Sequence, residues 1–305
     1  MNMRQAEYIL AVLQEGGISA AAQKLYISQP ALSQSIKNIE VELNAQIFLR
    51  GTSPLRLTYA GEKVAEIARQ YIMLDLNLKN IIADINKEVS GTFRFGTSKG
   101  IGDTLLPKLV PSYIREYPQV DLKILELGSQ DIEKKILDHT LDAGLVRAYQ
   151  LKPNLKYILV EEDSLVLIVG RNSSFARAHP DDVEVEFAEL ENQRFIAKRR
   201  GNRSRFLLDQ LCNIYQITPQ IPFEFNQFYT SVQTAIACDC VLISSLTTLK
   251  RNPDLMRRAM TYRLKNVNIS HNIYLCYHEE LYLTKYMWKW FELTKQYFYS
   301  ELISL

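Results

Sequence analysis

The sequence contains few of the residues that build disulfide frameworks, metal clusters and membrane spans. It has 305 residues but only four cysteines and four histidines. Four cysteines in so long a chain fix no disulfide framework, and the histidines show no spacing typical of metal ligands. No apolar run approaches the ~20 residues that span a bilayer, and no secretory signal opens the chain. We therefore expect a cytoplasmic protein with no membrane contact, no bound metal and no other cofactor.

A strong net charge is also absent. Lysine and arginine number 36 and aspartate and glutamate 34, so the formal net charge is only +2. Such a chain has no general affinity for polyanions, and any binding of nucleic acid must come from individually placed contacts. Motifs of common catalytic sites are missing too, namely Gly-x-Ser-x-Gly, a Walker loop, His-Glu-x-x-His and a dinucleotide fingerprint. The protein is not expected to be an enzyme.

The most informative segment lies near the amino terminus, where the pattern predicts three short helices. Residues 8–13 belong to an amphipathic helix that Gly16-Gly17 ends, and Ser19 can cap the second helix. Ser28 is a good N-cap for the third helix, in whose first turn Pro30 loses no hydrogen bond. Two short helices joined by a tight turn are typical of a DNA-binding motif.

The third helix has two different faces. At about 100° per residue, one stripe is apolar and is expected to pack: Leu32, Ile36, Ile39 and Leu43. The other side is polar and carries the residues that we expect to contact DNA: Ser28, Gln29, Pro30, Ser33, Gln34 and Lys37. Glutamine can pair with adenine, serine can bond either base edge, and lysine can reach a phosphate. An ordinary solvated face is the alternative interpretation of these residues.

A hairpin is predicted directly after the three helices. Residues 47–50 and 55–58 are short extended runs, and the turn-forming residues 51–54 join them. Arg50, Thr52 and Arg56 are placed to reach backbone phosphates or an adjacent groove. Three helices followed by a hairpin make a winged helix-turn-helix.

These motifs resemble those of a known family. The run Ala-Ala-x-x-Leu-x-x-Ser-Gln-Pro-Ala-Leu-Ser-x-x-Ile-x-x-Ile-Glu, followed by Ile-Phe-x-Arg and Leu-Thr-x-Ala-Gly-Glu, is similar to the signature of LysR-type transcriptional regulators. The resemblance covers residues 3–62 and departs at Gly17, usually Ser, and Gln34, often Arg. It implies operator DNA, a small-molecule effector and RNA polymerase as partners, and a homodimer or homotetramer as the assembly.

One long helical pattern follows, from Thr58 to about Val89. Its apolar residues alternate spacings of three and four, as in a coiled-coil seam: Val64, Ile67, Tyr71, Leu74, Leu78, Ile81 and Ile85. A seam needs a partner, so we expect dimerisation through this helix, and the family resemblance implies the same. The alternative is a helix that packs on its own domain.

Strands and helices alternate through the rest of the chain, which predicts parallel sheets with covered faces. Strands are expected at 92–96, 121–127, 143–146, 165–170, 195–197 and 241–244, helices at 105–117, 132–138, 206–215 and 227–237, and crossovers or returns at 157–161 and 273–277. The aromatic-rich helical segment 282–298 is expected in the core or in a subunit contact. The layout resembles the type 2 periplasmic-binding-protein fold, with two α/β lobes around one cleft.

The expected fold is therefore α/β: a winged helix-turn-helix, a linker helix and a two-lobed effector-binding domain. The boundaries that we predict are 1–58 for the DNA-binding domain, 59–89 for the linker helix and 90–305 for the effector-binding domain, with lobe I at 90–161 and 266–305 and lobe II at 162–265.

The ligand cleft of such a fold lies at the carboxyl ends of strands. Two strand-to-helix junctions offer hydroxyls and free amides, and in the family these junctions commonly line the effector pocket, which indicates Thr97, Ser98 and Ser129. The alternative is that Ser98 and Ser129 only cap helices. The basic segment 198–205 of the other lobe adds Lys198, Arg200 and Arg203, with Arg147 a weaker candidate. Donors from both lobes favour a small anion, most simply a carboxylate.

Three other interpretations compete with an effector-controlled regulator. Cys238-Asp239-Cys240 invites a metal or redox role, but peroxide-sensing members of the family carry their reactive cysteine near 198–205, where this chain has none. We expect Cys238 and Cys240 to be small packing residues. The other two are a ligand-free constitutive regulator, and a two-lobed solute-binding protein or enzyme.

Overall fold

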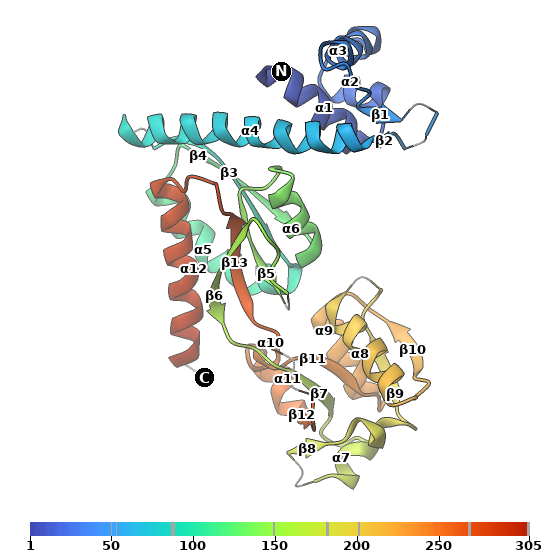
Figure 1. Cartoon of the computed structure of the whole chain (residues 1–305). Coiled ribbons are helices and arrows are strands. Elements are labelled where there is room, and N and C mark those ends of the chain that lie inside the picture. The colour runs from blue at the N-terminus through green and yellow to red at the C-terminus, as the bar shows by residue number, and fades with distance from the viewer. Residues whose placement is uncertain are drawn as a thin grey trace. The chain divides into compact units, whose positions relative to one another are not determined.

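The computed structural model describes residues 1–49, 51–52, 54–86, 89–148, 150–180, 183–200, 202–267 and 270–303. The chain divides into two compact units. The first unit contains residues 1–90 together with two short segments, 138–140 and 280–285, and the second contains the remaining residues. Figure 1 labels the elements of both units.

The first unit is a winged helix-turn-helix followed by a long helix. Its elements are α1 (Met3–Glu15), α2 (Ile18–Lys24), α3 (Gln29–Glu42), β1 (Phe48–Leu49), β2 (Arg56–Leu57) and α4 (Tyr59–Ile85). The predicted hairpin is confirmed, since Phe48 pairs with Leu57 in an antiparallel register. Buried Ile9, Val12 and Leu32 lie in the core between the three short helices. The predicted order of three helices and a hairpin is therefore confirmed.

Local capping sets the ends of these helices. Gly16 adopts a φ of +69° and ends α1, and the Ser28 hydroxyl accepts a hydrogen bond from the Ala31 amide at the start of α3, as predicted. The prediction for Ser19 was wrong, because α2 begins at Ile18 with Gly17 as its N-cap. The apolar stripe of α3 is also shorter than predicted. Leu43 is 39% exposed because the helix ends at Glu42.

Two contacts tie the wing to the helices around it. The Glu40 carboxylate of α3 accepts hydrogen bonds from the amides of Ile47 (2.7 Å) and Phe48 (3.3 Å), and so holds β1 against α3. At the start of α4, the backbone of Gly61 lies so close to the Ile47 carbonyl that an added Cβ would stand 2.0 Å from its oxygen. Only glycine fits at this position of the Leu-Thr-x-Ala-Gly-Glu motif.

Replacing that glycine tests the close approach. Gly61→Ala would force the Ile47 carbonyl and the wing to shift, and overpacking of this kind costs about 1–3 kcal/mol. Thermal unfolding of this variant should show a lower midpoint for the first unit. The matched control is Gly17→Ser, whose added atom meets nothing within 4 Å and which provides an N-cap oxygen to α2. Equal unfolding midpoints for Gly61→Ala and the wild type would show that the close approach of Gly61 to the Ile47 carbonyl does not restrict this position.

The second unit contains two α/β lobes. Lobe I contains β3 (Gly91–Thr97), α5 (Lys99–Glu116), β4 (Val120–Glu126), α6 (Ser129–Leu137), β5 (Ala143–Arg147), β6 (Leu155–Glu161), β13 (Ile273–His278) and most of α12 (Lys285–Ile303). Its sheet has the order β4-β3-β5-β13-β6. Helix α5 begins earlier than the predicted Leu105, because the Gly102 amide donates to the Ser98 carbonyl and the helix runs through its glycines.

Lobe II holds the intervening part of the chain. Its elements are β7 (Leu165–Gly170), α7 (Ser174–Ala178), β8 (Glu184–Val185), η1 (Phe187–Leu190), β9 (Arg194–Ala197), α8 (Arg203–Ile214), β10 (Gln220–Glu224), α9 (Phe228–Ala237), β11 (Leu242–Ser245), α10 (Leu246–Lys250), α11 (Pro253–Arg258) and β12 (Ala259–Leu264). The main sheet has the order β11-β7-β12-β8, and β9 pairs with β10. Separate apolar clusters pack on the two faces of β7, with Val169 in one and Ile168 in the other.

The predicted parallel pairing is confirmed for β3 with β4 and β5 and for β9 with β10, but the main sheet of each lobe is mixed. In lobe I, β13 runs antiparallel to β5 and to β6, and in lobe II, β7 runs antiparallel to β11 and to β12. These are the strands that follow a crossover from the other lobe. A strand that enters from the other lobe starts at the end of the sheet where its neighbours finish, so it must run in the opposite direction.

The aromatic carboxyl-terminal segment packs inside lobe I. The Trp290 ring of α12 lies edge-on to Phe95 of β3 and to Tyr113 of α5, with ring centroids 5.2 Å and 5.0 Å away. Trp290 and Phe291 are fully buried. Of the two roles predicted for this segment, the structure shows the core role.

Candidate functional site

The predicted DNA-contacting residues form an exposed face of α3. Gln29, Pro30, Gln34 and Lys37 are exposed, and Ser33 is half-buried. Below them, Leu32, Ile36 and Ile39 are buried and fix the helix to its own domain. The side-chain amide of Gln34 donates to the Asn38 carbonyl oxygen at 2.7 Å, so part of this face is already ordered in the free protein.

The wing has a polar tip with two different kinds of residue. The Thr52 hydroxyl donates to the Leu49 carbonyl at 3.1 Å and accepts from the Arg56 amide at 3.2 Å, so it closes the turn of the hairpin. The Arg56 side chain is exposed. Arg50 lies outside the described residues. The wing therefore presents the Arg56 side chain at its surface and uses Thr52 to hold its own shape.

The predicted seam of α4 is largely uncovered. Leu74, Leu78 and Ile85 are 67%, 60% and 68% exposed, and Ile67, Tyr71 and Ile81 are exposed as well. Val64 is the exception, because it packs against the core of the winged domain. Ile82 is a further exposed apolar residue that the heptad pattern did not include. A large apolar surface on one long helix needs a partner.

The other face of α4 packs on its own unit. Ala65 and Ala68 are buried against α1. The side chain of Asn77 donates to the Glu280 carbonyl at 2.7 Å and accepts from the Tyr282 amide at 2.8 Å. The helix is therefore fixed on one side and leaves the seam open on the other.

A cavity of 740 Å³ lies between the two lobes of the second unit. Lobe I contributes mainly the turns after β3 and β4, and lobe II contributes the turn after β9 and the starts of α9 and α10. This volume is in the range of small-molecule sites. Three predicted residues line it, namely Ser98, Lys198 and Arg200, together with the weaker candidate Arg147.

The other predicted effector residues do not line the cavity in the part of the chain that the structure describes. Thr97 is fully buried at the end of β3, and its hydroxyl is directed to the Ser98 carbonyl. Ser129 accepts a hydrogen bond from the Arg147 amide at 3.0 Å, so it fixes the end of β5. The side chain of Arg203 lies outside the described residues.

Lys198 is the most buried charged residue that lines the cavity from lobe II. Lys198 is the first residue after β9 and is only 6% exposed. The ammonium donates to the Ser231 hydroxyl at 2.9 Å and to the Asn226 carbonyl at 3.1 Å. Burial lowers the pKa of this ammonium from its usual value of 10.5 to about 8. A buried cation with neutral neighbours is a suitable partner for an anion.

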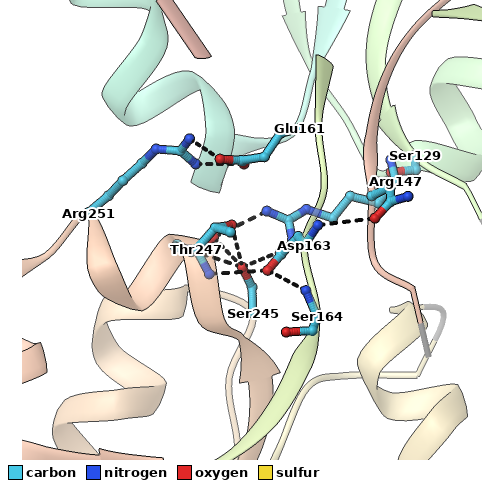
Figure 2. A network of polar contacts seen from close by, with 10 residues as sticks. Ser129, Arg147, Glu161, Asp163, Ser164, Ser245, Thr247 and Arg251 are labelled. Carbon is cyan, nitrogen blue, oxygen red and sulfur yellow. Dashed lines mark hydrogen bonds and ion pairs between the residues drawn. The ribbon is translucent and has the colours of Figure 1, made fainter. Parts of the chain in front are cut away.

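A network of polar contacts lies beside the cavity at the first crossover between the lobes (Figure 2). Its centre is Asp163, whose side chain is fully buried. The carboxylate accepts from the Arg147 guanidinium at 2.8 Å, from the Ser245 hydroxyl at 2.6 Å, and from the amides of Ser164 and Thr247 at 2.8 Å and 3.1 Å. We call these groups the crossover network.

The crossover network joins three parts of the second unit. Arg147 is the last residue of β5 in lobe I, Asp163 lies in the crossover, and Ser245 and Thr247 stand at the start of α10 in lobe II. Arg147 also donates to the Thr248 hydroxyl at 3.1 Å. Burial lowers the pKa of the Arg147 guanidinium, and the charge of Asp163 opposes that effect. The arginine is therefore held by the protein and is not a free anion receptor.

A second buried ion pair lies on the same crossover. Glu161, the last residue of β6, pairs with Arg251 after α10, and one of the two bonds measures 2.9 Å. Both side chains are almost fully buried. The Arg251 guanidinium also lies over the Phe298 ring of α12, 5.1 Å from its centre. No local sequence pattern indicated this pair or Asp163, because Glu161 and Arg251 are 90 residues apart and Asp163 is 82 residues from Ser245.

The described cysteines belong to no cluster of side chains that could hold a metal ion. Cys212, Cys240 and Cys276 are buried, Cys238 is half-buried, and no described group of three or more His, Cys, Asp or Glu side chains could hold a metal ion. Burial raises the pKa of the Cys212 thiol to about 11 and that of Cys276 to about 12. Such thiols stay protonated and unreactive at neutral pH.

The winged helix-turn-helix, the long helix and the two-lobed cavity together define a DNA-binding protein with a ligand-binding domain. Residues 3–62 match the family model of bacterial regulatory helix-turn-helix proteins of the lysR family, and residues 86–298 match that of the LysR substrate binding domain. The chain therefore belongs to the LysR family of DNA-binding transcription regulators. None of its described helices is long and apolar enough to cross a membrane.

Similar proteins span nearly the same length. A probable RuBisCO transcriptional regulator of Emiliania huxleyi is 30% identical over 81% of this chain and 80% of that protein. A full-length structure of an OxyR variant from Pseudomonas aeruginosa has a TM-score of 0.68 at 18% identity and covers 97% of each chain. A full-length CbnR structure in complex with its target DNA has a TM-score of 0.52 at 19% identity, covering 97% of this chain and 99% of that one. These structures show the same fold.

The crossover network can be tested by one substitution. Asp163→Asn keeps the shape of the side chain but leaves the buried Arg147 without its counterion, which should destabilise the second unit by about 3–5 kcal/mol. Denaturant unfolding measures the loss. The matched control is Asp254→Asn, which breaks an exposed contact to Arg257 and should change stability by less than about 1 kcal/mol. Similar losses for the two variants would contradict the account.

Proposed function

We propose that this regulator recognises an operator with α3, assembles through the seam of α4, and responds to a small anion bound in the cavity. It acts in the cytosol, with RNA polymerase as its partner at the promoter. The observation that carries the proposal is the cavity itself, where Ser98 of lobe I faces the same space as Lys198 and Arg200 of lobe II. A ligand held by both lobes binds one arrangement of them better than another, and so shifts their equilibrium.

Base recognition by α3 rests on the chemistry of its exposed face. Gln29 and Ser33 can bond base edges, Pro30 can meet a thymine methyl group, and Lys37 suits a phosphate. The chain carries Gln34 where the family often has Arg, and its amide is bonded to Asn38. Since net charge gives little general attraction, specificity must come from these placed groups and from doubling the domain in a dimer.

Two substitutions separate the base contacts from the phosphate contacts. Gln29→Ala should weaken binding to the operator by about 1–3 kcal/mol and leave binding to random DNA nearly unchanged. Lys37→Ala should weaken both and reduce the slope of affinity against salt concentration. Fluorescence anisotropy at several salt concentrations measures both quantities. Equal losses of Gln29→Ala on operator and random DNA would exclude a role in base recognition.

Assembly through α4 rests on the exposed seam. Its residues Ile67, Tyr71, Leu74, Leu78, Ile81 and Ile85 are exposed at the spacing of a coiled coil, and the opposite face already packs on the first unit. An exposed apolar stripe of this length is covered most simply by the same stripe of a second copy. The dimer would place two α3 helices on one operator, which favours an operator with two half-sites.

A charge in the seam tests this contact. Leu78→Asp places a carboxylate where a second apolar stripe should lie, so it should weaken the dimer and lower operator affinity while each unit stays folded. Sedimentation measures the assembly, and circular dichroism checks the fold. Leu78→Met, which keeps an apolar side chain, is the control and should assemble like the wild type. An unchanged assembly in Leu78→Asp would place the dimer contact elsewhere.

The pH dependence of effector binding tests the role of Lys198. Its pKa of about 8 means that the protonated form, which attracts an anion, is lost as the pH rises through 8. Affinity for an anionic effector, found by a thermal-shift screen of metabolites, should therefore fall above pH 8. Stability of the free protein should change in the opposite direction. The folded state binds fewer protons than the unfolded state between pH 8 and 10.5, so stability rises with pH there.

Calorimetry at pH 7 and pH 9 measures the affinity. Lys198→Gln should bind more weakly at pH 7 by about 1.5–3 kcal/mol and should lose the pH dependence, because the titrating group is gone. Affinity that is constant from pH 7 to 9 in the wild type would show that Lys198 does not touch the effector. Tight binding of an uncharged or purely cationic effector would refute the proposal of an anion.

A further inference from the structure

The charges that line the cavity are divided between the two lobes. Lobe I contributes three carboxylates, those of Asp103, Glu126 and Asp131, and two cations, Lys99 and Arg147, of which Arg147 is paired with the buried Asp163. Lobe II contributes the cations Lys198, Arg199 and Arg200, and no described aspartate or glutamate of this lobe lines the cavity. All described carboxylates that line the cavity therefore lie on the wall of lobe I, and the opposite wall is basic.

Some of these charges are already paired within their own lobe. Asp103 forms an ion pair with Lys99 at 3.2 Å, one helical turn away. Lys198 is held by Ser231 and Asn226, which are neutral partners. Glu126 makes no ion pair with a described residue but lies near enough to Lys99 for the two charges to attract each other, and Asp131 makes no side-chain hydrogen bond or ion pair with a described residue.

The same is true of the two arginines on the opposite wall. Arg199 and Arg200 are exposed, and their guanidinium groups have no hydrogen bond or ion pair to any residue in the described part of the chain. Asp131 on lobe I and the two arginines on lobe II are thus free to bind a ligand, and Glu126 shares only the nearby charge of Lys99. The buried Lys198 adds a third cation to the basic wall.

A simple anion could pair only with the cations of lobe II and would leave the carboxylates of lobe I without a partner. Closing the cavity around it would bring Glu126 and Asp131 near a negative charge and remove water from them without a partner, which costs free energy. An ammonium group on the same ligand would meet these carboxylates and remove that cost. The acidic wall therefore discriminates against plain anions, while the basic wall still requires a negative group.

We propose that the effector is a small zwitterion of the amino-acid class, with its carboxylate toward Lys198 and Arg200 and its ammonium toward Glu126 and Asp131. The inference rests on the proposed function, because it assumes that the cavity is the effector site, and it assigns the anionic group bound by lobe II to the carboxylate of a zwitterion. The 740 Å³ volume admits a molecule of this size, and Ile101, Leu127 and Phe228 provide apolar surface for a side chain.

The test uses the full-length protein and matched sets of probes. The twenty amino acids are screened by thermal shift, and each that binds is compared by calorimetry with its deaminated acid and its decarboxylated amine. Removing either charged group should weaken binding by about tenfold or more. Glu126→Gln should weaken binding of the amino acid about tenfold and should leave the affinity for the deaminated acid unchanged or increase it. Asp103→Asn is the control, since its carboxylate lines the same cavity but is paired with Lys99, and it should change affinity by less than about twofold.

Each contrary outcome has a separate meaning. A deaminated acid that binds as tightly as the amino acid, with no effect of Glu126→Gln, overturns the zwitterion and leaves the anion-responsive regulator standing. If no amino acid binds, the inference is also overturned, and the proposed function then depends on whether any other anion binds.

Discussion

The buried carboxylate of Asp163 is the interaction on which the effector-binding unit depends most. It lies in the first crossover and accepts hydrogen bonds from lobe I, from the crossover and from lobe II. A fully buried charge is tolerated only when its partners surround it, and here they come from three separate parts of the fold. The same contacts fix the end of β5 and the start of α10, and both contribute residues to the cavity wall.

This constraint explains why Arg147 is not the anion receptor that its position indicated. Its guanidinium is bonded to Asp163 and Thr248, so its charge serves the junction between the lobes. The cations left for a ligand are on the other wall, where Lys198, Arg199 and Arg200 follow β9. The junction is thus built from buried paired charges, whereas the cations on the wall of lobe II have no described ionic partner.

Much of the fold could be predicted because its signals are local. The Ser28 cap, the glycine that ends α1, the wing and the long helix α4 all follow from residues close together in the sequence. The directions of β7 and β13 could not be predicted, because they depend on which lobe the chain has just left. At the cavity, Ser98, Lys198 and Arg200 could be predicted because each follows a strand. Thr97 and Ser129 also lie at strand-to-helix junctions, but their hydroxyls bond the backbone and do not line the cavity. Glu126 and Asp131 were missed because a strand end and a first helical turn commonly carry acids.

The central claim is that the cavity and the DNA-binding helices act on one equilibrium. The most direct measurement is calorimetric affinity for the identified effector with the free protein and with the protein bound to its operator. Because coupling between two sites is reciprocal, the account predicts different affinities in the two states, typically by about 5–150-fold. The change in operator affinity on adding the effector should equal that factor. Equal effector affinities with and without operator would contradict the account, since the cavity would then not control DNA binding.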